Sequence, residues 1–153
     1  MVFTLVGLNL IDRLGRRTLM YIGSVSYIVS LLLVATAFFQ GWSGMAVPIF
    51  LFMFIGAHAV GQGTVIWVFI SEIFPNHLRA KGQSMGSSTH WVMAAIITIF
   101  MPPMLSGADN PGVIFLLFAG MMVLQLLFVR FMMPETKGVS LEDLQEKLSG
   151  RKQ

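Results

Sequence analysis

The chain has 153 residues, of which 56% are hydrophobic and only 11% are charged. Soluble domains carry about 25% charged residues, so this composition excludes an ordinary soluble domain. The net charge of +3 does not indicate a nucleic-acid binder, because basic and aromatic residues are not interleaved, and the absence of cysteine excludes a disulfide framework.

Long stretches without any Lys, Arg, Asp or Glu divide the chain. They cover residues 18–71, 82–108 and 110–129. A helix needs roughly 20 mainly apolar residues to cross the bilayer core, so the first stretch is long enough for two spans and the others for one each. A soluble protein of this length would not bury four such helices.

The first apolar segment, residues 1–11, is too short to cross at about 1.5 Å rise per residue. It lacks the basic region and cleavage site of a secretory signal peptide, and we interpret it as the second half of a helix whose beginning is missing. Four full spans are predicted next, at residues 18–40, 46–71, 83–105 and 112–133. We expect helices because lipid cannot satisfy free backbone groups, and the alternating strands of a barrel are absent from the sequence.

The ten basic residues all fall on one side of these predicted spans. They lie in the first and third connections and at or after the end of the last span: Arg13, Arg16, Arg17, Arg79, Lys81, Arg130, Lys137, Lys147, Arg151 and Lys152. The second and fourth connections, residues 41–45 and 106–111, carry none. Because basic loops stay in the cytoplasm, this side and the C-terminus are expected to be cytoplasmic.

The tail, residues 134–153, is more polar than the rest of the chain. Ser140 can cap a helix, with Asp143 three residues later as its capping partner. Three leucines then recur at helical spacing: Leu141, Leu144 and Leu148. We predict a short amphipathic helix at the cytoplasmic face, and the alternative is a solvated tail without structure.

Two interruptions are expected inside the spans. Gly61, Gln62 and Gly63 form a weak point, because glycine costs a helix about 1 kcal/mol. Pro102 and Pro103 are expected to interrupt the third span near its outer end. Transporters tend to place substrate contacts where helices bend or break, although membrane helices also tolerate glycine and proline without any such role.

Polar and aromatic side chains within the spans are the candidates for ligand binding. A sugar needs hydrogen bonds to its hydroxyls and flat apolar surfaces against its C–H faces, and tryptophan beside Gln or His supplies both. The sequence offers Gln62 with Trp67 in the second span, and His90 with Trp91 in the third. Trp67 is also placed as an interfacial residue would be, whereas Trp91 is too deep for that role.

Histidines inside a span are functional candidates by default. His90 has polar neighbours and can hydrogen-bond a hydroxyl or respond to pH, although a neighbouring helix can also satisfy it in its neutral form. His58 lies in the outer half of its span with no evident partner, and we expect a structural role for it.

No motif of an enzyme is present. The glycines at Gly56 and Gly61 are not followed by the Lys-Ser/Thr of a phosphate-binding loop, and Glu72 with His77 does not form a metal-ligand pair. No serine sits in a nucleophile elbow. We therefore expect no catalytic residue, no metal and no cofactor.

Three motifs resemble those of the sugar porters of the major facilitator superfamily. The segment from Asp12 to Arg17 has the D-R-x-G-R-R form of their loop between helices eight and nine. Ser-Glu-Ile-Phe-Pro at 71–75, followed by Arg-Ala-Lys-Gly at 79–82, resembles the exit of helix ten. Pro-Glu-Thr-Lys-Gly at 134–138 matches the motif after helix twelve. The resemblance therefore implies a partial C-terminal bundle of this fold, running from late helix eight to the tail.

The resemblance also implies substrate contacts. The helix-ten tryptophan corresponds to Trp67 and the glycine before it to Gly63, while the pair early in helix eleven corresponds to His90 and Trp91. The sequence departs from the family in two places. His90 replaces the usual amide, and the proline that normally follows the position of Gly63 is absent, so the identity of the sugar is left open.

A charge network at the cytoplasmic helix ends is likewise implied by the resemblance. Its candidate members are Asp12, Arg13, Arg16, Arg17, Glu72, Arg79 and Glu135. In this family such a network is taken to brace the cytoplasmic side while the transporter faces outward. The alternative is that these charges only set the orientation of the chain in the membrane.

Together these observations predict part of a secondary transporter that moves a monosaccharide by alternating access, with proton coupling left open. The expected partners are the monosaccharide, the lipid bilayer and the N-terminal half of the transporter, and nucleic acid is excluded. We expect that the chain alone does not transport. Two alternatives remain: a transporter of another solute, such as a drug/proton antiporter, and a membrane interaction module that transports nothing.

Overall fold

The computed structural model describes residues 7, 9–11, 13–42 and 44–138. Five helices are arranged in the order α2 (Arg16–Phe39), α3 (Ala46–Val60), α4 (Gln62–Ile73), α5 (Arg79–Gly107) and α6 (Gly112–Phe131). The described residues before Gly15 are also helical, and none of the described residues forms a strand. The amphipathic helix predicted in the tail lies outside the described residues, as does Asp12.

Four helical stretches are long and apolar enough to cross a membrane, α3 and α4 being counted together as Ala46–Ile73. They fall on the four predicted spans and extend the third one at both ends. The prediction of an all-α membrane protein is therefore confirmed.

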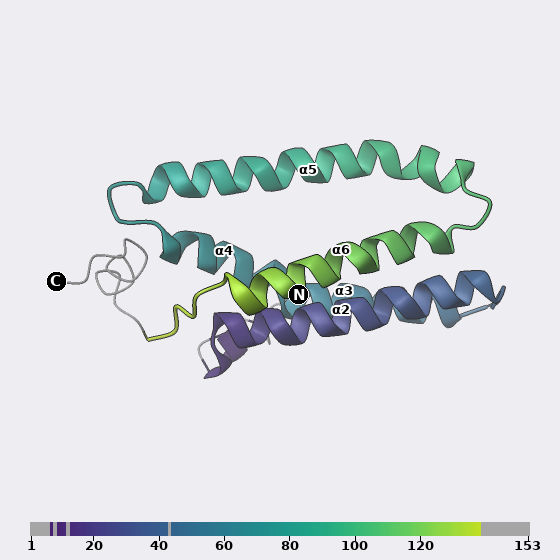
Figure 1. The fold of residues 1–153 in the computed structure, drawn as a ribbon, viewed down its shortest axis with the longest axis horizontal. Helices are drawn as coiled ribbons and strands as arrows, with labels where there is room; N and C mark the ends of the chain where they lie inside the picture. The colour runs from purple at the N-terminus through teal and green to yellow at the C-terminus, as the bar shows by residue number, and fades with distance from the viewer. Residues whose placement is uncertain (1–6, 8, 12, 43, 139–153) are drawn as a thin grey trace.

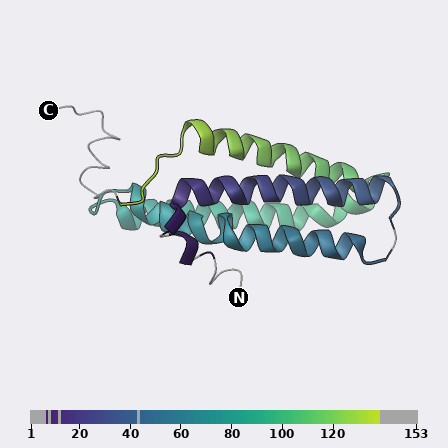
Figure 2. The same ribbon diagram turned by 90° about the horizontal axis from the view of Figure 1, so that it is seen from below.

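Helix α2 is the centre of the described bundle. Both α6 and α3 pack along it, and Figure 2 shows α2 running between them. Its contact faces bury small and branched side chains almost completely, among them Leu19, Val34 and Ala37. Between membrane-spanning helices, close van der Waals contact stabilises such packing, because lipid is as apolar as the side chains that it would replace.

The second predicted span consists of two helices instead of one. α3 ends at Val60 and α4 begins at Gln62, with Gly61 between them at φ −88° and ψ −98°. Gly61 lies against Gly23 of α2, so closely that a Cβ on Gly23 would be 2.8 Å from the Gly61 Cα. The helix therefore breaks at the glycine-rich weak point, where two helix backbones touch.

The expected interruption at Pro102 and Pro103 is wrong. α5 continues through both prolines to Gly107. The proline φ is close to that of a helix, and the pair removes only the two N–H bonds that would reach the carbonyls of Thr98 and Ile99.

Helix α5 contacts the rest of the bundle mainly through α4, near its own start. Gly82 lies against the ring of Phe74, and Gly86 lies against Ile70. Beyond that region α5 runs apart from α2 and α6, as Figure 1 shows, and its most apolar stretch is not buried at all.

The ends of the bundle differ in charge. The start of α2, the turn between α4 and α5, and the segment after α6 lie together at one end in Figure 1. All the described Lys and Arg residues lie in these segments or in the helix turns next to them. At the opposite end, Asn110 links two helices, because its Nδ2 donates to the Phe38 carbonyl at 3.2 Å and its Oδ1 accepts the Gly112 N–H at 2.8 Å.

We predict that Gly23→Ala destabilises the bundle, because the added Cβ would meet backbone of Gly61 and could fit only if α2 moved away. The free energy of unfolding should fall by about 1–3 kcal/mol. Gly120→Ala is the matched control, since nothing lies within 4 Å of a Cβ there and alanine favours a helix by about 1 kcal/mol. Circular dichroism during a denaturing-detergent titration measures both, and equal midpoints for the two variants would contradict the Gly23–Gly61 contact.

Candidate functional site

A cavity of about 450 Å³ opens between α4, α5 and α6, with α2 and α3 behind it. We call it the Trp67 cavity. It is lined by all five residues that the sequence singled out for ligand binding: Gln62, Gly63, Trp67, His90 and Trp91. Its wall is completed by five more residues: Met20, His58, Ile66, Gln125 and Phe128. The described lining residues include no Asp, Glu, Lys or Arg.

The aromatic wall of the cavity is built from α4 and α5. The rings of Trp67 and His90 meet edge to face with centroids 5.1 Å apart, and His90 and Trp91 meet in the same way at 5.5 Å. Trp67 is 40% exposed and Trp91 is 64% exposed. Both indoles therefore have free surface against which a flat apolar face of a ligand can pack.

The polar floor of the cavity depends on a buried serine. Ser24 of α2 is fully buried, and its Oγ accepts hydrogen bonds from Gln62 Nε2 at 3.3 Å and from Gln125 Nε2 at 3.5 Å. Gln62 is only 8% exposed, and its Oε1 has no hydrogen-bond partner among the described residues. Three helices thus bring one hydroxyl and two amides together beneath the tryptophans.

Sequence reasoning missed Ser24 and Gln125. Gln125 is the only polar side chain between Gly112 and Val129, and this isolation in an apolar helix could have identified it. Ser24 offered no such signal, since α2 contains three serines.

His58 has a partner, contrary to the expectation from the sequence. The Tyr27 hydroxyl of α2 lies 3.5 Å from His58 Nδ1, within hydrogen-bond distance, and the two rings meet edge to face. The other ring nitrogen, Nε2, lies near Gly63, where a Cβ would be only 3.2 Å from it. Glycine at 63 therefore lets the imidazole lie against the start of α4, on the wall of the cavity.

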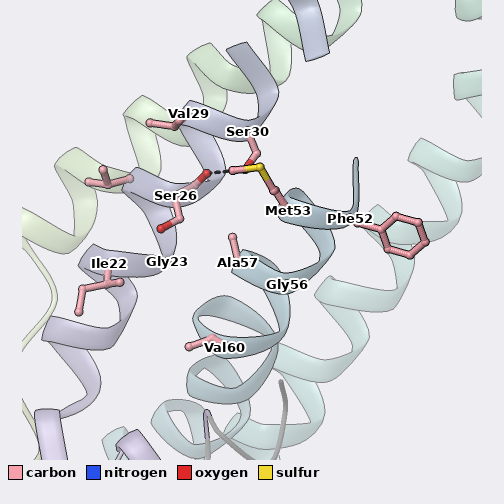
Figure 3. Close-up of a pocket in the computed structure, with 11 residues that line it drawn as sticks. Ile22, Gly23, Ser26, Val29, Ser30, Phe52, Met53, Gly56, Ala57 and Val60 are labelled. Carbon is pink, nitrogen blue, oxygen red and sulfur yellow. Dashed lines mark hydrogen bonds between the residues drawn. The ribbon is translucent and has the colours of Figure 1, made fainter. Parts of the chain in front are cut away.

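A second cavity, of about 520 Å³, lies between α2 and α3 and is shown in Figure 3. Small residues such as Gly23, Gly56 and Ala57 line it. Ser30 Oγ donates to the Ser26 carbonyl at 2.8 Å, so this hydroxyl is satisfied within its own helix. An apolar groove of this kind can pack against apolar groups but offers few polar contacts for a hydrophilic ligand.

The charged end of the bundle holds a bidentate ion pair. Arg16 of α2 donates to Glu72 of α4 through Nη2 at 2.7 Å and Nε at 3.1 Å, and the two side chains are only 13% and 25% exposed. The hydroxyl of Thr136 donates to the same carboxylate. We call these three residues, with Arg17 and Glu135, the Arg16–Glu72 cluster.

Glu135 caps the start of α2 through contacts with backbone N–H groups. Its carboxylate accepts the backbone N–H groups of Arg16 at 2.9 Å and Arg17 at 3.1 Å. A carboxylate satisfies unpaired N–H groups there and interacts favourably with the helix dipole. Gly15 makes room for it, because a Cβ would lie 2.7 Å from Glu135 Oε2 and the Gly15 φ of +89° favours glycine.

Arg17 caps the other kind of helix end, because it donates to free carbonyls at the end of α6. Its guanidinium donates to the carbonyls of Val129, at 3.2 Å, and Arg130, at the end of that helix. Lys137 also reaches back, donating from Nζ to the Arg13 carbonyl. The start of α2 and the end of α6 therefore supply each other's missing hydrogen-bond partners.

The structure does not bring every predicted member into the Arg16–Glu72 cluster. Arg79 Nε is buried and has no hydrogen-bond partner in the part of the chain that the structure describes. Arg13 is exposed and contributes its carbonyl. Thr136 was not predicted as a member of the cluster, although it belongs to the same motif that identified Glu135.

Comparison with known proteins agrees with this arrangement. Residues 1–148 match the family described as "Sugar (and other) transporter". The chain belongs to this sugar transporter family. The resemblance noted from the three motifs is thereby confirmed over nearly the whole chain.

Curated relatives include sugar–proton symporters. The arabinose-proton symporter of Bacillus subtilis (strain 168) is 37% identical over 148 residues, which cover 95% of this chain and 31% of the relative. The "D-xylose-proton symporter-like 3, chloroplastic" of Arabidopsis thaliana is 36% identical over 152 residues, covering 97% of this chain and 26% of the relative. The chain thus spans about a quarter to a third of the length of these relatives.

Solved structures show the same fold. The inward-open xylose transporter XylE from E. coli superposes with a TM-score of 0.89 at 30% sequence identity, covering 95% of this chain and 33% of that one. The proton:xylose symporter XylE bound to 6-bromo-6-deoxy-D-glucose superposes with a TM-score of 0.86 at 28% identity, covering 95% and 32%. Both superpositions confirm the predicted partial bundle of the major facilitator fold.

We predict that Arg16 and Glu72 are coupled energetically. In a double-mutant cycle with Arg16→Gln and Glu72→Gln, the coupling free energy should be about 1–2 kcal/mol, because the pair is bidentate and partly buried. Denaturing-detergent titrations of the four proteins measure it. The pair Lys81→Gln and Glu72→Gln is the control and should be additive, and additivity in both cycles would contradict the bidentate contact.

Proposed function

We propose that the chain forms part of a secondary transporter that moves a monosaccharide across a membrane by alternating access. The observation that carries this proposal is the gathering of all five predicted ligand-binding residues in the Trp67 cavity. Its volume lies within the range of about 300–1,000 Å³ that is usual for small-molecule sites. Relatives named for arabinose and xylose support a monosaccharide as the substrate class.

Each of the five predicted residues has a role in this proposal. Trp67 and Trp91 pack against the C–H faces of the sugar, and Gln62 and His90 hydrogen-bond its hydroxyls. Gly63 has no side chain and therefore leaves room for the ligand beside Gln62 and Trp67. The bond from Gln62 Nε2 to Ser24 fixes the amide, which limits the rotamer freedom lost when the ligand binds.

The Arg16–Glu72 cluster is proposed to brace one state of the transport cycle at the cytoplasmic side. The distribution of basic residues supports that orientation. The cluster ties α2, α4 and the segment after α6 together through charge-assisted bonds, and separating these ends would break several of them at once. A bias of a few kcal/mol is sufficient to shift a two-state equilibrium of this kind.

The proposal includes a partner for the exposed apolar surface. Ile99 and Phe100 on α5, and Leu117 on α6, are each more than half exposed within the described bundle. We propose that the N-terminal half of a transporter and the lipid bilayer cover such side chains between them. The 153-residue chain alone is therefore expected to bind its sugar weakly and not to transport it.

We predict that Trp67→Leu weakens binding of D-xylose and L-arabinose by about 5- to 30-fold, because the loss of a stacked ring costs about 1–2 kcal/mol. Equilibrium dialysis of the chain in nanodiscs with labelled sugar measures this. Trp42→Leu is the matched control, since Trp42 lies in the connection after α2, at the opposite end from the charged residues. The absence of saturable binding of any monosaccharide would contradict the proposed function, and binding of an apolar drug instead would favour the antiporter alternative.

A further inference from the structure

We propose that the preferred substrate of the Trp67 cavity is a monosaccharide that carries a carboxylate, bound together with one proton on the histidines His58 and His90. This inference rests on the proposed function, because it names the substrate class of the same cavity.

The first step is the placement of the histidines. His58 comes from α3 and His90 from α5, and both line the Trp67 cavity. The third histidine, His77, lies in the turn between α4 and α5, at the charged end of the bundle. Two of the three imidazoles in the chain therefore meet at the one cavity that also carries free tryptophan surface and amides.

The second step is the charge around them. Among the described residues, the cavity has no acidic or basic wall residue on any helix. From α2 the titratable neighbour is Tyr27, which hydrogen-bonds His58, while α4 and α6 contribute Gln62 and Gln125. An imidazolium formed here has no counter-ion in the described protein. Burial makes such a charge costly unless an opposite charge lies beside it, and an anionic ligand would supply one.

The third step is what an imidazole adds to an amide. Amides already donate to and accept from sugar hydroxyls, so a neutral sugar is fully served by Gln62 and Gln125. An imidazole differs because it can take up a proton near neutral pH. At position 90 the chain departs from the amide that the family resemblance implies, which replaces a permanently neutral donor with one that can become positive.

Protons and charges balance in this binding step. A sugar carboxylate is ionised above about pH 4 and enters with one negative charge. One imidazole takes a proton from the solution, so the occupied cavity is neutral. The sign of the pH dependence follows: lowering the pH from 7.5 to 5.5 increases the fraction of imidazolium while the carboxylate stays ionised, and binding of the anion tightens.

The experiment compares D-glucuronate with D-glucose on the chain in zwitterionic nanodiscs, by equilibrium dialysis at pH 7.5 and 5.5. Because a protonated imidazole supplies the positive charge that the carboxylate pairs with, D-glucuronate should bind up to about 10-fold more tightly at pH 5.5 than at pH 7.5. D-Glucose should bind equally at both values.

Variants assign the effect to the cavity. The double variant His58→Gln and His90→Gln should lose the pH dependence of D-glucuronate binding. Its far-ultraviolet circular dichroism spectrum should match that of the unaltered chain, which shows that it is folded. His77→Gln is the matched control and should behave as the unaltered chain.

Each outcome is decisive. If D-glucose binds but D-glucuronate does not tighten at pH 5.5, or if the double variant keeps the pH dependence, the inference is wrong and the proposed function stands. If neither sugar binds at either pH, the proposed function itself fails.

Discussion

The bidentate bond between Arg16 and Glu72 fixes the end of the bundle from which the rest of the site is built. It joins the first turn of α2 to the last turn of α4. Glu135 caps α2 from the segment after α6, and Arg17 satisfies the last carbonyls of α6 in return. Unpaired backbone groups and charges are costly where water is scarce, so these exchanges hold three helix ends in one register.

That register determines what faces the cavity. Helix α4 is held at one end by the Glu72 ion pair and begins at the break beside Gly61. In this position Gln62 and Trp67 line the cavity. The contact of Gly23 with Gly61 brings α2 close enough for the next residue, Ser24, to accept from Gln62. The same structural elements that close the charged end thus orient the polar floor, and a transporter of this design would couple ligand contacts to the helix ends through α4.

The sequence was sufficient for features that depend on local composition. Charge-free runs located the spans, and the glycines around Gln62 located the break, because lipid and backbone flexibility act on any helix in the same way. Five of the ten residues that line the cavity were also predicted, since polar and aromatic side chains stand out in such segments. What could not be predicted depends on helix rotation. Ser24 and the pairing of Tyr27 with His58 require knowledge of which faces of α2 and α3 meet.

The central claim, that α4 and α6 face one ligand cavity, can be tested by cysteine accessibility because the chain has no cysteine of its own. Single substitutions Ile66→Cys and Phe128→Cys lie on the cavity wall, and Leu117→Cys lies on α6 away from it. In proteoliposomes, the two cavity cysteines should react with a membrane-impermeant thiol reagent and be protected by D-xylose, whereas Leu117→Cys should not react. Equal reactivity of all three, or no protection by sugar, would contradict the account.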